Sequence, residues 1–419
     1  MSPRILPFLT AIALTIGCAP EKTATSPTPA TETPVASGTA SALTIEASES
    51  PAPAGAAEPF LSTAKNGDIL LSWLEPVAGT KKHALRFSRF AGGAWSEPRT
   101  IVERDDLFVN WADFPSIVAD GSETMFAHWL QKSGGDTYSY DVRMATSRDG
   151  GATWGESFLL NRDGKQSEHG FVTLLGLESG IAATWLDGRN MMPGHGDHAG
   201  DMTLRYAHVD AKGALTDEVE LDTRTCECCT TGMTMTPDGP VIVYRDRSAE
   251  EIRDIAFVSR NASGWSEPAT LHQDGWKIAG CPVNGPQVDA AGTRIAAAWF
   301  TAAEGKSHVY AAWSDDGGRS FGAPVILDDG RPLGRVDVVM LDETRALVTW
   351  LEQTADAAEI RARIVPFGGT AAPSQKIADS GSARGSGFAR ITRSGNDVWF
   401  AWTATEGESK QVRLARIRF

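Results

Sequence analysis

Arginine and carboxylate side chains recur at short spacing along the 419-residue chain. The candidate ligand-binding residues are Trp111, Asp187, Arg189, Arg245, Asp246, Arg247 and Arg335, and the candidate acids and bases are Asp113, Glu168 and Glu250. An arginine can donate two parallel hydrogen bonds to one carboxylate, and a neighbouring carboxyl group can transfer a proton. This combination predicts a site for an anionic ligand. The competing interpretation is a set of structural ion pairs between adjacent loops, because such pairs are common in proteins.

Cysteines form a second group of reactive side chains. In an oxidising compartment they are expected to form two disulfides, for which three pairings exist. Thiolates together with His169, or with His195 and His198, would instead suit Cu(I) or Zn(II). The disulfide interpretation is preferred, so neither a metal nor another cofactor is predicted. The four cysteines concerned are Cys226, Cys228, Cys229 and Cys281.

The elements that must position these residues follow a repeated pattern. A short apolar strand that ends in an aromatic residue, then an apolar and a polar one, recurs seven times, with 51 to 59 residues between successive aromatic residues. A repeat of this length, built of strands and turns, is typical of a β-propeller with four strands in each blade. We therefore predict an all-β, seven-bladed β-propeller. The aromatic residues are Trp73, Trp129, Trp185, Tyr244, Trp299, Trp350 and Trp402.

Two turn sequences specify the kind of propeller. Residues 147–154 read Ser-Arg-Asp-Gly-Gly-Ala-Thr-Trp, and residues 314–321 read Ser-Asp-Asp-Gly-Gly-Arg-Ser-Phe. Asp and Gly suit a tight hairpin turn, and the last aromatic side chain can pack between blades. Both octets resemble the Asp-box, or BNR repeat, of the sialidase superfamily. The resemblance implies a sialidase-like β-propeller over residues 42–419, and because typical sialidases have six blades, a six-bladed ring is the alternative.

The last repeat lacks its fourth strand. Residues 410–419 provide the third strand, and the chain then stops. Residues 42–47 form an isolated apolar strand near the other end of the chain. We expect this N-terminal strand to pair with the final strand, because pairing closes the ring and removes an open edge.

The phase of the repeat predicts where the chemistry lies. In a propeller, the connections between the second and third strands and those between blades share one face, and the candidate residues fall in these connections. Sialidases hold a sugar carboxylate with three arginines and use an Asp acid and a Tyr nucleophile assisted by a Glu. No tyrosine of this chain has an obvious nucleophile position. The resemblance implies a clamp of Arg189, Arg245 and Arg335, an acid at Asp113, and a base at Glu168 or Glu250.

The N-terminal segment predicts export. Residues 1–18 combine a basic start with a short apolar stretch, as in a signal peptide. Residues 14–18, Leu-Thr-Ile-Gly-Cys, resemble a bacterial lipobox, which implies lipidation of Cys18. Residues 19–41, rich in Ala, Pro, Thr and Ser, are expected to be a disordered tether. Ala19 after the cysteine favours the outer membrane of a Gram-negative cell envelope.

Charge narrows the choice of partners. The chain has 39 Lys and Arg against 53 Asp and Glu, a formal net charge of −14. This balance argues against binding to nucleic acid or to an anionic membrane surface, so we expect membrane contact through the lipid anchor only. The predicted function is an exo-sialidase-type glycoside hydrolase that acts on terminal acidic sugars. The alternatives are a non-catalytic propeller that binds glycan or protein, and an envelope metal-binding protein that uses Cys, His and Met residues.

Overall fold

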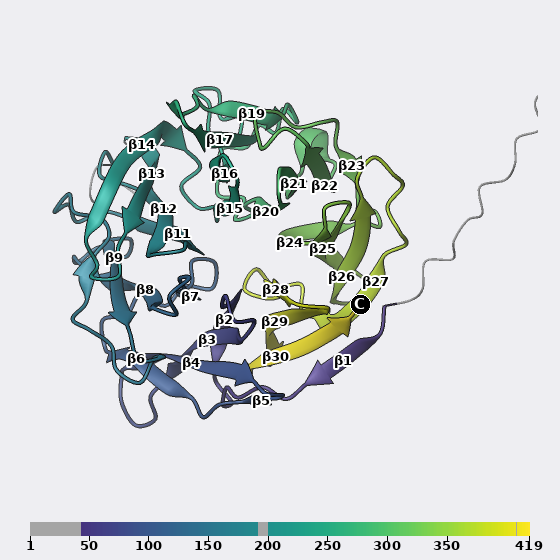
Figure 1. Cartoon of the computed structure of the whole chain (residues 1–419). Helices are drawn as coiled ribbons and strands as arrows, with labels where there is room; N and C mark the ends of the chain where they lie inside the picture. Colours follow the sequence, from purple (N-terminus) through teal and green to yellow (C-terminus); the bar gives the residue numbers. More distant parts are fainter. Residues whose placement is uncertain (1–42, 192–199, 408) are drawn as a thin grey trace, which may run out of the picture. The chain divides into compact units, whose positions relative to one another are not determined.

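The computed structural model describes residues 43–191, 200–407 and 409–419. These residues form thirty β-strands and one short 3-10 helix, η1 (Ala303–Gly305). The strands make seven antiparallel sheets that surround a common centre (Figure 1). The prediction of an all-β, seven-bladed propeller is confirmed, and the six-bladed alternative is wrong. Among the described residues, no helix has the length and apolarity needed to cross a bilayer.

Each blade is a sheet whose strands follow one another along the chain. The first blade contains β2 (Ala57–Thr63), β3 (Ile69–Pro76), β4 (His83–Ala91), β5 (Ala94–Trp95) and β6 (Arg99–Arg104). The second contains β7 (Ser116–Ala119), β8 (Met125–Lys132), β9 (Tyr140–Ser147) and β10 (Phe158–Leu159). The third contains β11 (His169–Gly176), β12 (Ile181–Asp187), β13 (Met202–Val209) and β14 (Leu215–Thr225). The fourth contains β15 (Gly232–Thr236), β16 (Gly239–Arg245), β17 (Ile255–Asn261), β18 (Gly264–Trp265) and β19 (Ala269–His272).

The remaining three blades complete the ring. The fifth contains β20 (Gln287–Ala291), β21 (Arg294–Thr301), β22 (His308–Ser314) and β23 (Val325–Ile326). The sixth contains β24 (Pro332–Asp342), β25 (Arg345–Gln353), β26 (Ala358–Pro366) and β27 (Gln375–Ser380). The seventh contains β28 (Arg390–Ser394), β29 (Asp397–Glu406), β30 (Ser409–Arg418) and β1 (Ile45–Ser48). In every blade one strand lies nearest the centre of the ring (Figure 1). From the first blade to the seventh, these inner strands are β2, β7, β11, β15, β20, β24 and β28.

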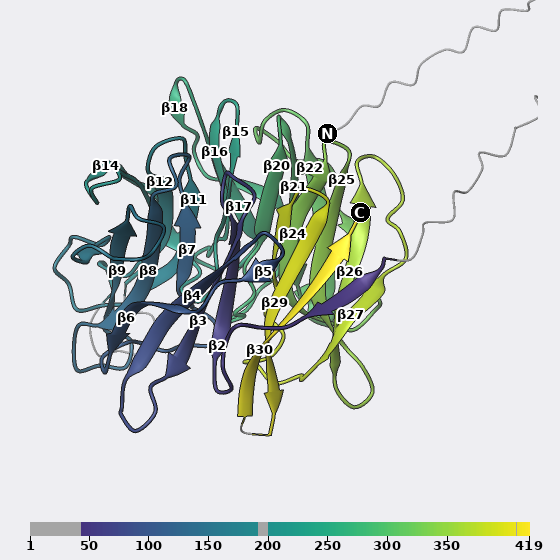
Figure 2. The same ribbon diagram turned by 60° about the horizontal axis from the view of Figure 1, so that its bottom comes forward.

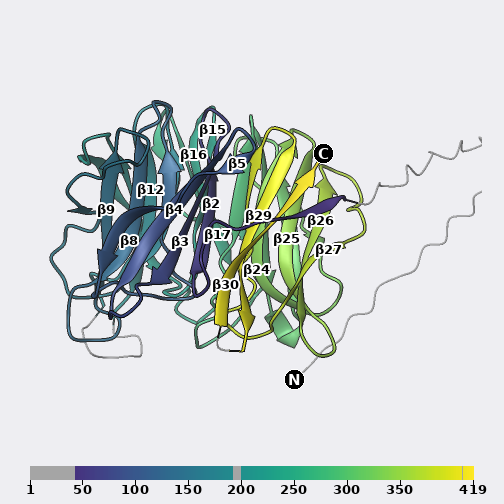
Figure 3. The same cartoon turned by 90° about the horizontal axis from the view of Figure 1, so that it is seen from below.

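The ring closes through β1. This strand pairs with β30 in antiparallel register, from Ile45 opposite Ile417 to Ser48 opposite Leu414. Figures 2 and 3 show β1 lying along β30 at the outer side of the seventh blade. The predicted closing strand is confirmed, with its bounds shifted from residues 42–47 to 45–48. Without β1, the outer edge of β30 would present unpaired backbone groups.

The repeated aromatic residues pack between blades and explain the polar residue that follows them. Their exposed fractions run from 0% for Trp73 to 6% for Trp402. The Trp73 indole N–H donates to Glu75 at 2.7 Å, and the equivalent bond of Trp185 goes to Asp187 at 2.8 Å. A buried indole N–H needs an acceptor, so the side chain two positions later is part of the packing.

The Asp-box turns fasten each hairpin to the preceding blade. Asp149 accepts hydrogen bonds from the Ser147 hydroxyl at 2.8 Å and from the Thr153 backbone N–H at 2.9 Å. A Cβ at Gly151 would lie 2.2 Å from the ring of Phe87 in the first blade, so only glycine fits there. Trp154 then meets the edge of Phe87, with ring centroids 6.1 Å apart. The predicted role of the octet as a turn with an interblade aromatic residue is confirmed.

Candidate functional site

The inner strands line a cavity of about 780 Å³ along the centre of the ring. At one end it is lined by Asp113, which precedes β7, and by Arg390, the first residue of β28. At the other end lie Lys65 and Glu178, which follow β2 and β11. The cavity therefore runs along the inner strands and reaches one of the predicted site residues, Asp113.

Asp113, which lines this end of the cavity, is one of two carboxyl groups that flank a buried phenol. Tyr140, the first residue of β9, donates its hydroxyl to Glu168 Oε1 at 2.8 Å, and the same Oη lies 3.5 Å from Asp113 Oδ2. The Phe171 backbone N–H holds Asp113 Oδ1 at 2.8 Å. A Cβ at Gly170 would lie 1.9 Å from Asp113 Oδ2, so this close approach requires glycine. The two predicted acid–base residues, Asp113 and Glu168, are thus brought together.

Burial changes the proton affinity of this group. Burial raises the pKa of Asp113 to about 7, although the Phe171 N–H and Tyr140 act to lower it. Burial, together with the nearby Asp113 and Glu227, raises the pKa of Glu168 to about 8, against the Tyr140 hydrogen bond. Burial and the two carboxyl groups raise the pKa of Tyr140 well above its ordinary value. Between pH 7 and pH 8, the carboxyl pair therefore holds about one proton and offers one donor and one acceptor.

Arg390 supplies positive charge to the cavity that Asp113 also lines. Its guanidinium lies over the ring of Phe114 at 4.9 Å, and among the described residues its buried Nε has no hydrogen-bond partner. Burial lowers the pKa of Arg390, although the nearby Asp337 acts in the opposite direction. The Asp337 carboxylate itself accepts the backbone N–H groups of Val338 and Ile391. Arg390 is thus a partly buried cation whose Nε–H is free to donate a hydrogen bond. Both properties favour the binding of an anion at this position.

A second cationic cluster covers the neighbouring aromatic rings. Arg335 lies 4.9 Å from the ring of Phe388, and Arg384 lies 5.5 Å from the ring of Trp111. The Phe388 ring packs 5.9 Å from both Trp111 and Phe114. Burial and the charge of Arg384 lower the pKa of Arg335 to about 10. Two of the predicted ligand-binding residues, Arg335 and Trp111, therefore belong to one layer of cations and rings.

These two clusters meet where Asp113 and Phe114 adjoin in the sequence, and we call them together the rim site. It consists of Trp111, Asp113, Phe114, Tyr140, Glu168, Arg335, Arg384, Phe388 and Arg390.

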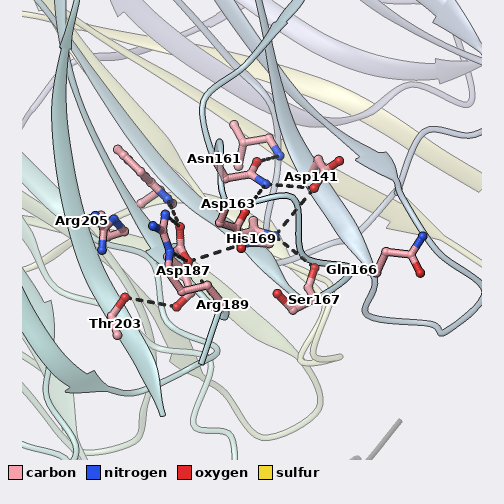
Figure 4. A network of polar contacts seen from close by, with 12 residues as sticks. Asp141, Asn161, Asp163, Gln166, Ser167, His169, Asp187, Arg189, Thr203 and Arg205 are labelled. Atoms are coloured by element: carbon pink, nitrogen blue, oxygen red, sulfur yellow. Dashed lines mark hydrogen bonds and ion pairs between the residues drawn. The ribbon is translucent and has the colours of Figure 1, made fainter. Parts of the chain in front are cut away.

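The predicted residues Asp187 and Arg189 form a structural ion pair instead (Figure 4). Arg189 Nε and Nη2 each donate to one Asp187 oxygen at 2.7 Å, and Asp187 also accepts the indole N–H of Trp185. Arg189 is a partner of the blade-packing carboxylate rather than a free clamp.

His169 extends the same network (Figure 4). Its Nδ1 faces the carbonyl oxygens of Tyr140 and Ser167, and its Nε2 lies 3.3 Å from Asp163 and 3.6 Å from Asp187. Although burial lowers the pKa of His169, the two carboxylates outweigh it and the pKa is raised. Since both ring nitrogens face acceptors, the surroundings of His169 favour its protonated form, which donates from both nitrogens and offsets the charge of the carboxylates.

Arg245, the third predicted clamp residue, is occupied by backbone groups. Its guanidinium donates to the carbonyls of Arg253 at 2.6 Å, Phe300 at 2.7 Å and Asn284 at 2.8 Å. It also lies 4.7 Å from the ring of Trp276. The interpretation as a structural residue, rather than a ligand clamp, fits Arg245.

The neighbouring predicted residues lie in the loop after β16. Arg247 pairs with Glu251 at 2.7 Å, and Asp246 accepts the Arg247 backbone N–H. Burial raises the pKa of Asp246 to about 6. Glu250 is exposed and accepts the Ser248 hydroxyl at 3.1 Å. None of these side chains contacts the carboxyl pair in the part of the chain that the structure describes.

The four cysteines come together in two neighbouring interblade connections. Within the described residues they have free thiol groups. The predicted histidine partners His195 and His198, and the predicted lipidation residue Cys18, lie outside the residues that the structure describes.

Sequence reasoning missed Tyr140 and Arg390. The connections before β9 and before β11 share one face, and an isolated β-bridge joins Tyr140 to Glu168. A tyrosine at the start of a third strand could therefore have indicated a residue close to Glu168. Arg390 is the first residue of the inner strand of the last blade. It was missed because arginines were sought mainly at the ends of the second strands.

Comparison with known proteins gives a family match. Residues 79–337 match the model of the BNR repeat-like domain. No curated protein matches the chain. Similar folds occur in solved structures: polysaccharide lyase Uly1 has 9% identity and a TM-score of 0.51, with 86% of this chain and 90% of that chain covered.

Two further structures of similar fold come from named organisms. The α-L-arabinanase of Penicillium chrysogenum, solved with arabinobiose, has 13% identity and a TM-score of 0.48, with 87% of this chain and 93% of that chain covered. The NanB sialidase of Streptococcus pneumoniae has 11% identity and a TM-score of 0.45, with 86% and 68% covered. At these identities the likeness concerns the fold alone. The domain match and the seven sheets show that this chain belongs to the BNR repeat-like domain family and is a sialidase-like β-propeller.

Proposed function

We propose that this protein is a glycan-active enzyme of the glycoside hydrolase type that acts on a terminal acidic sugar at the rim site. The observation that carries the proposal is the cavity shared by Asp113 and Arg390. Its lining includes both a carboxyl group whose pKa is about 7 and a guanidinium whose Nε has no hydrogen-bond partner among the described residues. A sugar carboxylate would neutralise the guanidinium, while the carboxyl pair would act on the glycosidic bond.

The binding half of the site is the layer of cations and rings. Arginine donates two parallel hydrogen bonds to a carboxylate, and a buried guanidinium binds more strongly because water competes less. The Nε atoms of Arg335 and Arg390 both lack a hydrogen-bond partner among the described residues. The aromatic ring of Trp111, which is half-buried in the same layer, offers a face for a sugar ring. This set replaces the clamp that the sequence predicted, keeping Arg335 and substituting Arg390 and Arg384 for Arg189 and Arg245.

The reacting half is the carboxyl pair with Tyr140. In the proposed reaction, the protonated carboxyl group gives its proton to the departing glycosidic oxygen. The ionised carboxylate takes the phenol proton as Tyr140 Oη forms a bond to the anomeric carbon. The glycosidic oxygen leaves as an alcohol with the first proton. Water then attacks the anomeric carbon and gives a proton to the carboxylate that acted as the acid, while the other carboxyl group returns the phenol proton to the departing Tyr140 Oη. The 2.8 Å contact of Tyr140 with Glu168 makes Glu168 the nearer acceptor of the phenol proton in the state in which Asp113 holds the proton that the pair shares.

A direct test measures cleavage of fluorogenic α-sialosides and uronides by the full chain. We expect turnover of at least one substrate, and we expect Tyr140→Phe to lower kcat by about 100-fold or more, since proton transfer and the nucleophile are lost together. Glu250→Gln is the matched control, because Glu250 is an exposed carboxylate outside the rim site, and it should retain activity.

The outcomes separate the candidate functions. Binding of acidic sugars without turnover would overturn catalysis and support a non-catalytic glycan-binding propeller. Absence of both binding and turnover across the acidic sugars would overturn the substrate class as well.

We also propose that the enzyme is exported and held in the cell envelope by a lipid on Cys18. The lipobox-like residues 14–18 and the tether-like composition of residues 19–41 support this. Labelling of cells with a radioactive fatty acid should mark the wild-type chain and leave Cys18→Ser unlabelled. Equal labelling of both chains would contradict the anchor.

A further inference from the structure

Three cysteines of one turn point their sulfur atoms at one another. The turn joins β14 to β15, and its Cys226 Sγ lies 3.2 Å from Cys229 Sγ and 3.7 Å from Cys228 Sγ. All three sulfur atoms lie within 4.8 Å of one another. Cys226 and Cys229 are buried, and Cys228 is partly buried, so the cluster forms within the packed interblade layer.

The fourth cysteine reaches the same point from the next interblade connection. Cys281 lies between β19 and β20 and is exposed, and the neighbouring Cys228 thiol lowers the pKa of the Cys281 thiol. The Cys281 carbonyl accepts a hydrogen bond from Arg384 at 3.2 Å, which ties this connection to the seventh blade. Three clustered sulfur atoms of one loop and the exposed Cys281 of a second loop, next to Cys228, therefore lie beside the rim site, in a chain with only five cysteines.

A buried cation accompanies the sulfur atoms. Arg253 is 0% exposed, and its Nη1 lies 3.3 Å from Cys226 Sγ and 2.9 Å from Glu227 Oε2. Its Nη2 donates to Glu251 at 2.9 Å. An N–H group directed at a sulfur atom stabilises a thiolate and is the kind of outer-shell contact that orients metal ligands. The guanidinium also offsets part of the negative charge that several thiolates would place in this buried position.

The sulfur spacing suits a metal ion better than a disulfide. A metal–sulfur distance of about 2.3 Å in a tetrahedron puts neighbouring sulfur atoms about 3.8 Å apart, close to the 3.7 Å between Cys226 and Cys228. The 3.2 Å between Cys226 and Cys229 is shorter than this spacing but well above the length of a disulfide bond. Disulfide sulfur atoms lie about 2.05 Å apart. A bridge between the near neighbours Cys226 and Cys229 would also close only a short loop, and such a bridge restricts the unfolded chain little.

We propose that Cys226, Cys228, Cys229 and Cys281 bind one thiophilic d10 metal ion, Zn(II) or Cu(I), with Arg253 as the positioning residue that donates to Cys226. Thiolate ligands select these ions over Mg(II) and Ca(II), which prefer oxygen. The site ties the interblade loops before β15 and β20 to each other. It is independent of the glycan activity, because none of its ligands belongs to the carboxyl pair or the cationic layer.

The test begins with the metal content of the full chain purified without chelator, measured by mass spectrometry of the metal and of the intact protein. We expect about one equivalent of zinc or copper, and four thiols, in addition to any from Cys18, that react after chelation and unfolding. A chain that contains two disulfides and no metal would overturn the proposal.

Reconstitution gives a second, independent readout. The reduced chain titrated with Zn(II), with Cu(I), or with Co(II) as a spectroscopic probe should saturate at one ion per chain, and the two physiological ions are told apart by their relative affinity. The cobalt form should show thiolate-to-metal charge transfer. Saturation at one ion without that absorption would overturn thiolate ligation.

Variants locate the ligands. Cys228→Ser and Cys281→Ser should each weaken metal binding by at least 10-fold and reduce the charge-transfer absorption, and Arg253→Lys should change binding less than Arg253→Gln. Thr230→Ser, in the same turn, is the matched control and should bind like the wild type. If a cysteine variant fails to fold, the cobalt spectrum of the wild-type chain alone decides between thiolate and other ligands.

Discussion

Asp113 should make the stability of the propeller depend on pH in a defined direction. Burial raises the pKa of its carboxyl group from an ordinary 3.8 to about 7. Between these two values the folded chain keeps a proton that the unfolded chain releases, so rising pH lowers the stability of the wild type. The loss begins near pH 4, grows up to pH 7 and is then constant.

The magnitude follows from the size of this pKa shift. One pKa unit corresponds to about 1.4 kcal/mol, so the two units between pH 5 and pH 7 correspond to about 2.7 kcal/mol. Asp113→Asn removes the titration but keeps the carbonyl oxygen that accepts the Phe171 N–H. We therefore expect the free energy of unfolding of the variant, relative to the wild type, to increase by about 2–3 kcal/mol between pH 5 and pH 8.

Urea denaturation of both chains at pH 5, 6, 7 and 8 measures this difference. Asp105→Asn is the control, because Asp105 is an exposed carboxylate and its substitution changes the net charge by the same amount. A stability difference between Asp113→Asn and the wild type that stays constant over this range, or that favours the wild type at pH 8, would refute the burial argument.

Three further substitutions test other parts of the site. Gly170→Ala places a Cβ 1.9 Å from Asp113 Oδ2, so thermal denaturation should show a destabilisation of about 1–3 kcal/mol; an unchanged stability would mean that the carboxyl group is not held in place. Arg245→Gln leaves buried carbonyls without donors, so it should cost about 3 kcal/mol of folding free energy, whereas a fully stable variant that lacks only activity would restore Arg245 as a ligand residue. Arg390→Met should leave stability at pH 5 within about 1 kcal/mol of the wild type, because burial raises the pKa of the neighbouring Asp337 to about 6 and a neutral Asp337 leaves no unpaired buried charge. The variant should nevertheless abolish the binding of acidic sugars, and a large loss of stability at pH 5 would show that Arg390 serves the fold.

The fold follows from the sequence because packing repeats with the chain. Each blade buries an aromatic side chain such as Trp73 or Trp185, and four of the seven donate their indole N–H to the side chain two residues later, so a pattern of aromatic, apolar and polar residues marks the second strand of the blades. The closing strand was equally predictable, because the last blade lacks a strand and an open edge is unfavourable. These constraints involve residues that are close in the sequence or that recur at a fixed spacing, so they can be recognised in a single sequence.

The site was predictable only in part, because the fate of each polar group depends on distant loops. Asp113 and Glu168 were found, since both precede inner strands on the same face. Arg245 resembled a ligand clamp, but the carbonyls that occupy it belong to Asn284 and Phe300, which lie 39 and 55 residues away in the sequence. No local pattern reveals that contact. Where Arg and carboxylate residues are neighbours in one loop, as in Asp187 with Arg189 and Arg247 with Glu251, they pair with each other rather than with a ligand.

The central claim is that a sugar carboxylate binds at Arg390, and calorimetric titration tests it most directly. The full chain is titrated with an acidic sugar that the enzyme accepts and with the methyl ester of the same sugar, for the wild type and for Arg390→Gln. We expect the wild type to bind the acid at least 100-fold more tightly than the ester, because a buried charge pair is lost, and we expect Arg390→Gln to lose this preference. Equal binding of acid and ester by the wild type, or an undiminished preference in Arg390→Gln, would contradict the account.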